Sequence, residues 1–443
     1  MKKHGLALLA LALVVAVQVG ATLVVKDYTG PVAVIAAVGF LLLAGELLAR
    51  LFEPLGLPHL SGYLCAGILA GPHVAGLIGH QTVHQLAPVN ALALTLIALA
   101  GGAELRIADL RRAARSLAWA TLSQNVLALV AIGGVFILLT RFMPFTHGMT
   151  FTAILGVAVL WGVMGTTRSP AATLAILSQT RAKGPLAEFT LAFIMTSDVV
   201  VLVLLAVAMM TARALLEGVA PNLAAFTDLG HELVGSTSLG VALGLGLAIY
   251  LRLIGRQVVL VLIAIGFGLT EALKYLRLDP LLTFMIAGFV VQNLSAQGKK
   301  LLESIERTGD VVFVVFFATA GTELDLPLLR QLWPVALALA VARGLATWGA
   351  HRLGSRLAGD SPFIRRWGFT GMISQAGLAL GLAMVVRQSF PSFGAEFGSL
   401  AVASLALNEM VGPVLFKLAL DRAGETAPAS LRAGPAPAPA ADG

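Results

Sequence analysis

The chain has 443 residues, of which 12% are charged and 58% are hydrophobic. A water-soluble domain usually carries about 25% charged residues, so this composition excludes a soluble enzyme or a soluble binding domain as the main part of the chain. The net charge of +7 does not indicate a nucleic-acid partner, because the basic residues are spread over many short loops. The composition indicates instead that most of the chain lies within a lipid bilayer.

Apolar stretches follow one another along nearly the whole chain, each long enough to cross a hydrocarbon core of about 30 Å. They predict an all-α polytopic membrane protein with thirteen or fourteen transmembrane helices. In chain order, the expected spans are 5–25, 31–52, 60–79, 87–103, 116–140, 149–179, 187–213, 236–254, 257–275, 280–296, 308–322, 332–354, 365–388 and 395–420.

The basic residues also indicate the orientation. Most of the 30 Lys and Arg residues lie in alternate loops, on the side that holds both chain ends, and basic loops remain in the cytoplasm. We therefore expect a multi-pass protein of the bacterial cytoplasmic (inner) membrane with cytoplasmic termini. Residues 1–30 are an extra transmembrane helix or a signal-like segment, and residues 421–443, rich in Ala and Pro, are expected to be a disordered cytoplasmic tail.

The two halves of the chain resemble each other at an offset of about 220 residues. Residues 64–68 (LCAGI) match 285–289 (MIAGF), and 100–105 (AGGAEL) match 320–324 (AGTEL). The loop charges give the two copies opposite directions through the membrane. We predict inverted repeats, which are typical of secondary transporters, although helices rich in small residues also resemble each other by chance. The repeats cover roughly 60–213 and 280–420 of a transporter domain at 31–420, with linker helices at 236–275.

Ionisable residues are rare inside the spans, and each is costly there unless it has a partner or faces a cavity. Asp198 lies near the middle of its span, where a carboxylate can hold a monovalent cation or a proton, so it is the first candidate for the ion-carrying residue. Arg343 is also mid-span and should need an anionic partner. Asp198 is the expected partner, and a cap on the carbonyl groups of a broken helix is the alternative.

Two spans contain residues that interrupt a helix. In the first, Thr167, Arg168 and Ser169 precede Pro170, which removes a backbone donor and disfavours helix at the residue before it. In the second, residues 371–377 (GMISQAG) include Ser374 and Gln375. A pair of interrupted helices in the two halves points to the transport site. With an offset of 211 residues, Asp198 corresponds to Glu409, which is expected to be a charge partner at this site or a purely structural one.

Three motifs resemble those of the cation:proton antiporter superfamily, particularly its bacterial sodium/proton and potassium/proton exchangers. They are 57–72 (LPHLSGYLCAGILAGP), 284–289 (FMIAGF) and 315–325 (VFFATAGTELD). The resemblance covers residues from about Pro31 to Leu420. It implies a homodimer whose core domain, with two crossed broken helices, moves past a dimerisation domain in an elevator mechanism.

The resemblance also assigns site residues. Asp198 matches the ion-binding aspartate, Ser197 the preceding position, and Arg343 the basic residue facing the site, while Thr167 and Ser169 belong to the first broken helix. Ser197 stands where members usually carry Asp, Asn or Gln, so a single carboxylate should favour electroneutral exchange. Arg168 stands at or beside a position that usually holds Thr or another small polar residue, and its charge would oppose a cation unless Asp198 or Glu409 neutralises it.

The leading hypothesis is therefore exchange of Na⁺ or K⁺ for H⁺ without a cofactor. Two alternatives remain open: an anion or organic-acid transporter in which Arg168 receives a carboxylate, and a transport-inactive, sensor-like protein locked by an Arg168–Asp198 pair. An enzyme is not expected, because the sequence has no nucleophile–base set or phosphate-binding loop, and its eight histidines have no metal-ligand spacing.

Overall fold

The computed structural model describes residues 2–24, 30–55, 57–217, 224–324, 326–375 and 377–427. Every regular element in these residues is helical. The first half contains α1 (Lys2–Val24), α2 (Gly30–Phe52), η1 (Glu53–Leu55), α3 (His59–Ala70), α4 (His80–Gln85), α5 (Ala87–Glu104), α6 (Ile107–Ser123), η2 (Gln124–Ala128), α7 (Leu129–Leu139), η3 (Thr140–Phe142), η4 (Pro144–Thr146), α8 (Phe151–Gly165), α9 (Pro170–Thr180) and α10 (Pro185–Glu217).

The second half contains α11 (Ala224–Leu253), α12 (Val258–Tyr275), α13 (Pro280–Leu294), α14 (Gly298–Thr322), α15 (Leu326–Ala358), α16 (Pro362–Trp367), η5 (Gly368–Met372), α17 (Gly377–Ser389) and α18 (Gly394–Ala423). Among the described residues, seven helical segments are long and apolar enough to cross a membrane, and seven shorter apolar helices accompany them. The predicted all-α polytopic class is confirmed.

Several of the expected boundaries were wrong: for example, α11 begins at Ala224 and α14 at Gly298, where spans at 236–254 and 308–322 were expected. The span expected at 60–79 stops at Ala70, because Gly71 caps α3 in extended backbone and a turn follows from Pro72. The span expected at 116–140 begins earlier, at Ile107, and α6 and α7 are joined by the π-helical turn η2. A π-turn carries one extra residue and often marks a functional site. Residues 421–427, which were expected to belong to a disordered tail, are ordered: α18 continues to Ala423, and Glu425 and Ala427 form hydrogen bonds with the rest of the protein.

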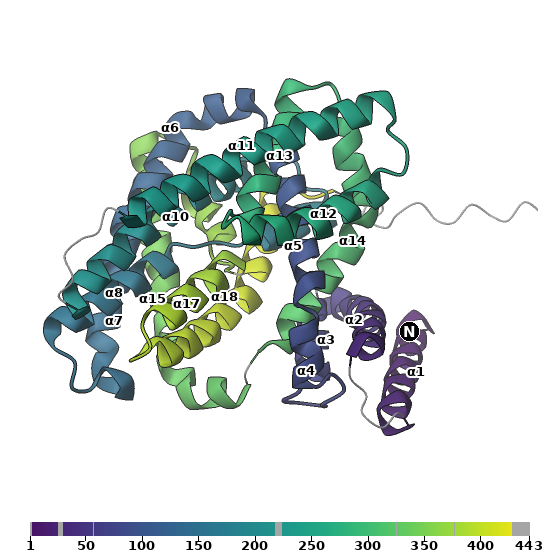
Figure 1. Ribbon diagram of the computed structural model, residues 1–443, viewed down its shortest axis with the longest axis horizontal. Coiled ribbons are helices and arrows are strands. Elements are labelled where there is room, and N and C mark those ends of the chain that lie inside the picture. Colours follow the sequence, from purple (N-terminus) through teal and green to yellow (C-terminus); the bar gives the residue numbers. More distant parts are fainter. Residues whose placement is uncertain are drawn as a thin grey trace, which may run out of the picture.

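Several helices pack against helices that are far from them in the sequence (Figure 1). Helix α5 packs on α13 and α3 packs on α14, while α1 and α2 lie side by side at one edge of the molecule. The long helix α11 packs along α13. The helices from the two halves of the sequence are therefore interleaved, and the broken helices lie within this arrangement.

The α5–α13 contact is close enough to require glycine on both sides. A β-carbon on Gly102 would overlap the carbonyl oxygen of Met285, and one on Gly288 would overlap that of Leu99. Both glycines belong to the repeated motifs: Gly288 lies in MIAGF (285–289), the repeat of LCAGI (64–68), and Gly102 lies in AGGAEL (100–105), which is repeated at 320–324. Such close backbone approach is typical of packing between transmembrane helices.

The α3–α14 contact is built in the same way. A β-carbon on Gly67 would overlap the carbonyl oxygen of Ala318, and one on Gly321 would overlap that of Leu64. In the predicted repeat, α3 corresponds to α13 and α14 corresponds to α5. The α3–α14 pair and the α13–α5 pair are therefore the same contact made once in each order. These reciprocal contacts support the predicted repeat relation.

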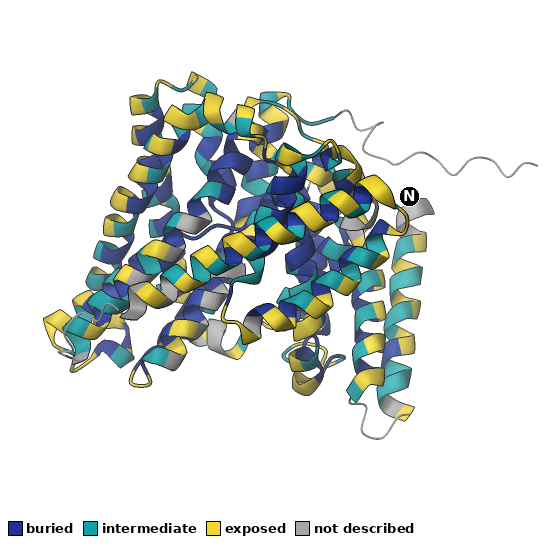
Figure 2. Ribbon diagram, turned by 45° about the horizontal axis from the view of Figure 1, so that its top comes forward, coloured by how far each residue is buried: buried dark blue, intermediate teal, exposed yellow. Residues whose placement is uncertain are grey.

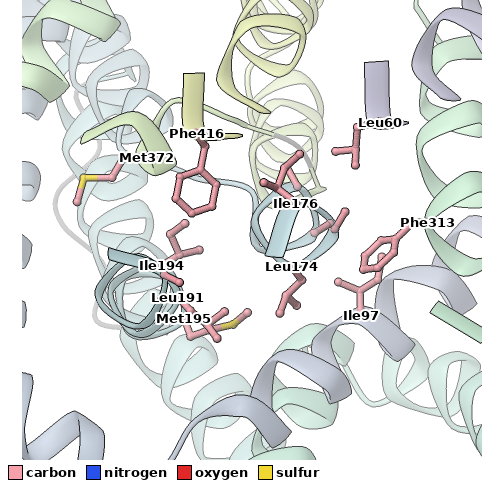
Figure 3. Packing of buried hydrophobic residues seen from close by; sticks show 14 of the residues in the cluster. Leu60, Ile97, Leu174, Ile176, Leu191, Ile194, Met195, Phe313, Met372 and Phe416 are labelled. Atoms are coloured by element: carbon pink, nitrogen blue, oxygen red, sulfur yellow. The ribbon is translucent and has the colours of Figure 1, made fainter. Parts of the chain in front are cut away.

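The buried residues gather in the centre of the molecule (Figure 2). One apolar cluster surrounds the half-helix α9 (Figure 3), where Leu174 and Ile176 lie between Ile194 of α10, Phe313 of α14 and Phe416 of α18. Packing from both halves of the chain therefore fixes α9, and with it the polar connection that precedes α9.

Candidate transport site

Two interrupted helices cross at the centre of the protein. Helix α8 ends at Gly165 and α9 begins at Pro170, while η5 ends at Met372 and α17 begins at Gly377. The backbone N–H of Ser169 donates to the carbonyl oxygen of Ser374 over 2.9 Å, which joins the two connections directly. Both predicted breaks are confirmed, and we call residues 166–169 and 373–375 together the crossover.

Arg343 of α15 holds the two connections together. Its guanidinium donates to the carbonyl oxygens of Gly165 (2.8 Å), Thr167 (2.8 Å), Ile373 (2.7 Å) and Met372 (3.1 Å). A helix C-terminus leaves such carbonyl groups without intrahelical partners and carries a partial negative charge. Arg343 therefore has the carbonyl-capping role that was the alternative at the sequence level.

The crossover also contains a chain of side-chain hydrogen bonds. The Nε2 of Gln375 donates to the hydroxyl of Thr167 over 2.9 Å and to the carbonyl of Met164 over 3.0 Å. The Oε1 of Gln375 accepts from Nδ2 of Asn408 over 2.8 Å. Thr167 in turn donates to the carbonyl of Met164. These contacts connect α8, the second connection and α18, and they place Thr167 beside Gln375.

Arg168 is fully enclosed, with 1% of its surface exposed. Its guanidinium donates to the carbonyl of Thr166 and, over 3.1 Å, to Oε1 of Gln124. The guanidinium carbon also lies 4.8 Å from the centre of the Phe193 ring, a cation–π contact. The guanidinium of Arg168, the second positive charge of the site, is thus contacted by residues of the first connection, η2 and α10.

The predicted ion-binding residues lie on the elements that meet here. Ser197 is buried in α10 and its hydroxyl donates to the carbonyl of Ile194 over 3.0 Å. The hydroxyl of Ser169 caps α9 by accepting from the N–H of Ala172. Ser374 is buried in the second connection. The backbone of Asp198 continues α10, while its side chain lies outside the described residues.

Glu409 of α18 is the other predicted acid. It is 8% exposed, and neither carboxyl oxygen has a hydrogen-bond partner. It follows Asn408, which binds Gln375 of the crossover. The structure therefore brings Glu409 into the same region as Arg343, although the two side chains form no ion pair.

Two polar residues that the sequence reasoning missed belong to this region. Gln124, in the π-turn η2, links Arg168 to α15 because its Nε2 donates to the carbonyl of Thr347 over 2.8 Å. Asn125 is 7% exposed and has no hydrogen-bond partner. A Gln-Asn pair inside an apolar span was the signal available in the sequence, because buried amides in a membrane need partners.

Asn125 also lines a groove between α6 and α10. The groove has a volume of about 390 Å³ and is lined by Leu117, Ala118, Thr121, Leu122, Asn125, Val126, Thr196 and Val200. The described residues contain no group of three or more His, Cys, Asp or Glu side chains that could hold a metal ion.

Comparison with known proteins identifies solved structures of similar fold. A search of curated proteins by sequence gives no match. The fold is similar to that of the sodium proton antiporter MjNhaP1 from Methanocaldococcus jannaschii at pH 8, with a TM-score of 0.62 and 17% identity, covering 88% of this chain and 96% of that one. An electron-microscopy structure of the same antiporter gives a TM-score of 0.70 at 17% identity, covering 90% and 100%.

The family is shown by sequence as well. A family model for the transmembrane part of sodium/hydrogen exchangers matches residues 40–416. That range includes both interrupted helices, the two buried arginines and the two acidic positions of the site. The chain therefore belongs to the sodium/hydrogen exchanger family of multi-pass membrane proteins.

Proposed function

We propose that the protein exchanges Na⁺ or K⁺ for H⁺ across the bacterial cytoplasmic membrane, with one proton for each cation. The observation that carries this proposal is the crossover, in which both half-helix C-termini are capped by Arg343 beside α10, the helix of Ser197 and Asp198. Discontinuous helices of this kind form the ion sites of secondary transporters. Membership of the exchanger family supports the same class of substrate.

Asp198 is the proposed ion-carrying residue. A carboxylate in this position binds a monovalent cation through oxygen, or is neutralised by a proton, and competition between the two couples their fluxes. Ser197, Thr167 and Ser169 add hydroxyl oxygens. The hydroxyls of Ser197 and Thr167 donate to backbone carbonyls, and that of Ser169 accepts from the N–H of Ala172, so the oxygen lone pairs can face a cation. Arg343 and Arg168 raise the cost of a bound cation and so favour its release.

The proposed cycle is an elevator movement in a homodimer with both termini in the cytoplasm. The hydrogen bonds among α8, α15, α18 and the second connection support this, because they join both interrupted helices into one unit that can move as a body. A moving unit of this kind exposes the same site to each side in turn.

The exchange can be tested in proteoliposomes with an imposed pH gradient. Addition of Na⁺ or K⁺, with choline as the inert control, should dissipate the gradient, and Li⁺ tests how strict the selection is. Clamping the membrane potential at different values with K⁺ and valinomycin during Na⁺-driven flux should leave the rate unchanged if one proton moves per cation. A rate that follows the potential would reject that stoichiometry, and silence with every cation would reject the exchange itself.

A further inference from the structure

A buried acid on α18 is not used by the mechanism above. Glu409 is 8% exposed, and neither of its carboxyl oxygens has a hydrogen-bond partner of normal geometry, although the backbone N–H of Gln375 lies near the carboxyl group. A carboxylate removed from water without hydrogen bonds needs a proton or another positive charge close by. Glu409 therefore requires an explanation beyond packing.

Arg343 does not supply a direct partner. Four of its five N–H donors bind carbonyl oxygens of the two interrupted helices, and no ion pair joins it to Glu409. Its charge still acts on Glu409 from a distance, and the charge of Arg168 acts on Arg343. These two guanidinium groups are the described charges that face this part of the site, and Asp198 is the other acid in the chain at a matching position.

The helix position of Glu409 connects it to the crossover. Asn408, the residue before it, donates to Gln375 over 2.8 Å. One turn later, a β-carbon on Gly412 would overlap Ser374. Glu409 thus lies between two residues of α18 that contact the second connection directly. A movement of the crossover would therefore change the surroundings of the Glu409 carboxyl group.

The sequence gives Glu409 and Asp198 equivalent places. Ser197–Asp198 lies on α10, the helix after the first interrupted helix, and Asn408–Glu409 lies on α18, the helix after the second. In each pair a polar residue precedes an acid. Ser197 and Asn408 are 211 positions apart, and so are Asp198 and Glu409. The described polar member of each pair is buried.

We propose that Glu409 is a second proton-carrying carboxyl of the exchange and not a fixed counter-charge to Arg343. This proposal rests on the cation/proton exchange proposed above. The two carboxyl groups share one exchangeable proton: in the proton-loaded state Glu409 is the neutral acid and Asp198 is a carboxylate. When a cation binds to Asp198, the O–H bond of Glu409 breaks and the proton leaves to water on the open side. The pair carries one negative charge before this step, and the pair with its cation carries one negative charge after it, so one proton leaves for each cation.

The native protein offers a direct test in detergent. Dicyclohexylcarbodiimide labels protonated carboxyl groups in apolar surroundings, and mass spectrometry separates the peptides that contain Glu409 and Asp198. Labelling of Glu409 should fall when Na⁺ or K⁺ is added and when the pH is raised, whereas choline should have no effect. Labelling that is absent, or that does not respond to cations and pH, would overturn the proposal.

A variant tests the same assignment in transport. Glu409→Gln should reduce Na⁺-driven proton release by about tenfold or more, while ²²Na⁺ counterflow, which needs no proton, stays near the native rate. Glu396→Gln, at an exposed position of the same helix, is the matched control. Native proton release in Glu409→Gln would overturn the proposal, and so would loss of counterflow in a folded variant, because Glu409 would then bind the cation itself.

The two proposals fail in different ways. If the wild-type protein moves no cation, the proposed cation/proton exchange is rejected, whatever the labelling of Glu409 shows. If the wild type exchanges and Glu409→Gln behaves like it, only the role of Glu409 is wrong. Should Glu409→Gln fail to fold, the labelling of the native chain decides the assignment.

Discussion

The side-chain amide of Gln375 donates a hydrogen bond of 2.9 Å to the hydroxyl of Thr167. This bond joins the connections of two interrupted helices that are more than 200 residues apart in the sequence. Gln375 also accepts from Asn408 of α18, so one amide group links three elements of the site. The shape of the crossover therefore depends on side-chain bonds as well as on the backbone.

Replacing Gln375 with Ala should destabilise the protein and slow transport. The change leaves the buried side-chain amide of Asn408 without its acceptor and removes the donor to the hydroxyl of Thr167, and a buried polar group left unsatisfied costs about 1–3 kcal/mol. Thermal unfolding in detergent and cation-driven proton flux measure the two effects. Gln81→Ala, at an exposed position of α4, should change neither, and a native melting temperature for Gln375→Ala would contradict this account.

Arg343→Lys should remove most of the transport activity although the charge is kept. A lysine ammonium has three donors on one nitrogen and cannot reach four carbonyl oxygens arranged on two connections. The uncapped carbonyl groups should destabilise the folded state by about 3 kcal/mol or more. Arg356→Lys, exposed on the same helix, serves as the control for thermal stability and flux. Equal flux in both variants would show that charge alone suffices at position 343.

Arg168→Thr should strengthen cation binding, because it removes a positive charge from the site. We expect the KM for the cation to fall by about three- to tenfold, while Arg168→Lys should keep a KM near the native value. The measurement is initial proton flux at increasing cation concentration. An unchanged KM in Arg168→Thr would place the guanidinium outside the reach of the cation, and Arg168-dependent uptake of an organic anion would favour the alternative transporter class.

Glu425 makes a structural contact whose removal should affect stability more than transport. Its carboxylate accepts from the N–H groups of Leu186 and Ala187 over 2.8 Å each, at the start of α10. Losing such a helix cap costs about 1 kcal/mol. Glu425→Ala should therefore lower the melting temperature, with Glu425→Gln in between, and flux below the transition should stay within about twofold of native. A larger loss of flux at an unchanged melting temperature would instead indicate that the contact regulates transport.

The sequence predicted the elements of the site well where a local rule applied. Pro170 stops the extension of α8 into α9, and the glycines around residues 371–377 interrupt the second helix, so both breaks could be placed from single residues. Arg343 was recognised as a buried charge that needs partners. Its four carbonyl partners lie at the two helix breaks, which are about 200 residues apart in the sequence. No pattern of neighbouring residues predicts that these two segments meet at Arg343.

Other features could not be read from the sequence for similar reasons. The π-turn at Gln124 arises where α6 and α7 pack against α15, and an apolar pattern does not show one extra residue in a turn. The predicted tail was placed too early because its Ala- and Pro-rich composition hides the cap that Glu425 makes on α10. That cap depends on the position of α18, which only the folded chain defines.

Proton flux in proteoliposomes containing Asp198→Asn, compared with the wild type and with Glu188→Gln, tests the central proposal most directly. Glu188 is an exposed acid near the start of the same helix, so it controls for the loss of a negative charge on α10. We predict cation-specific dissipation of the pH gradient in the wild type and in Glu188→Gln, and none in Asp198→Asn. Native flux in a folded Asp198→Asn protein would contradict the assignment of Asp198 as the ion-carrying residue.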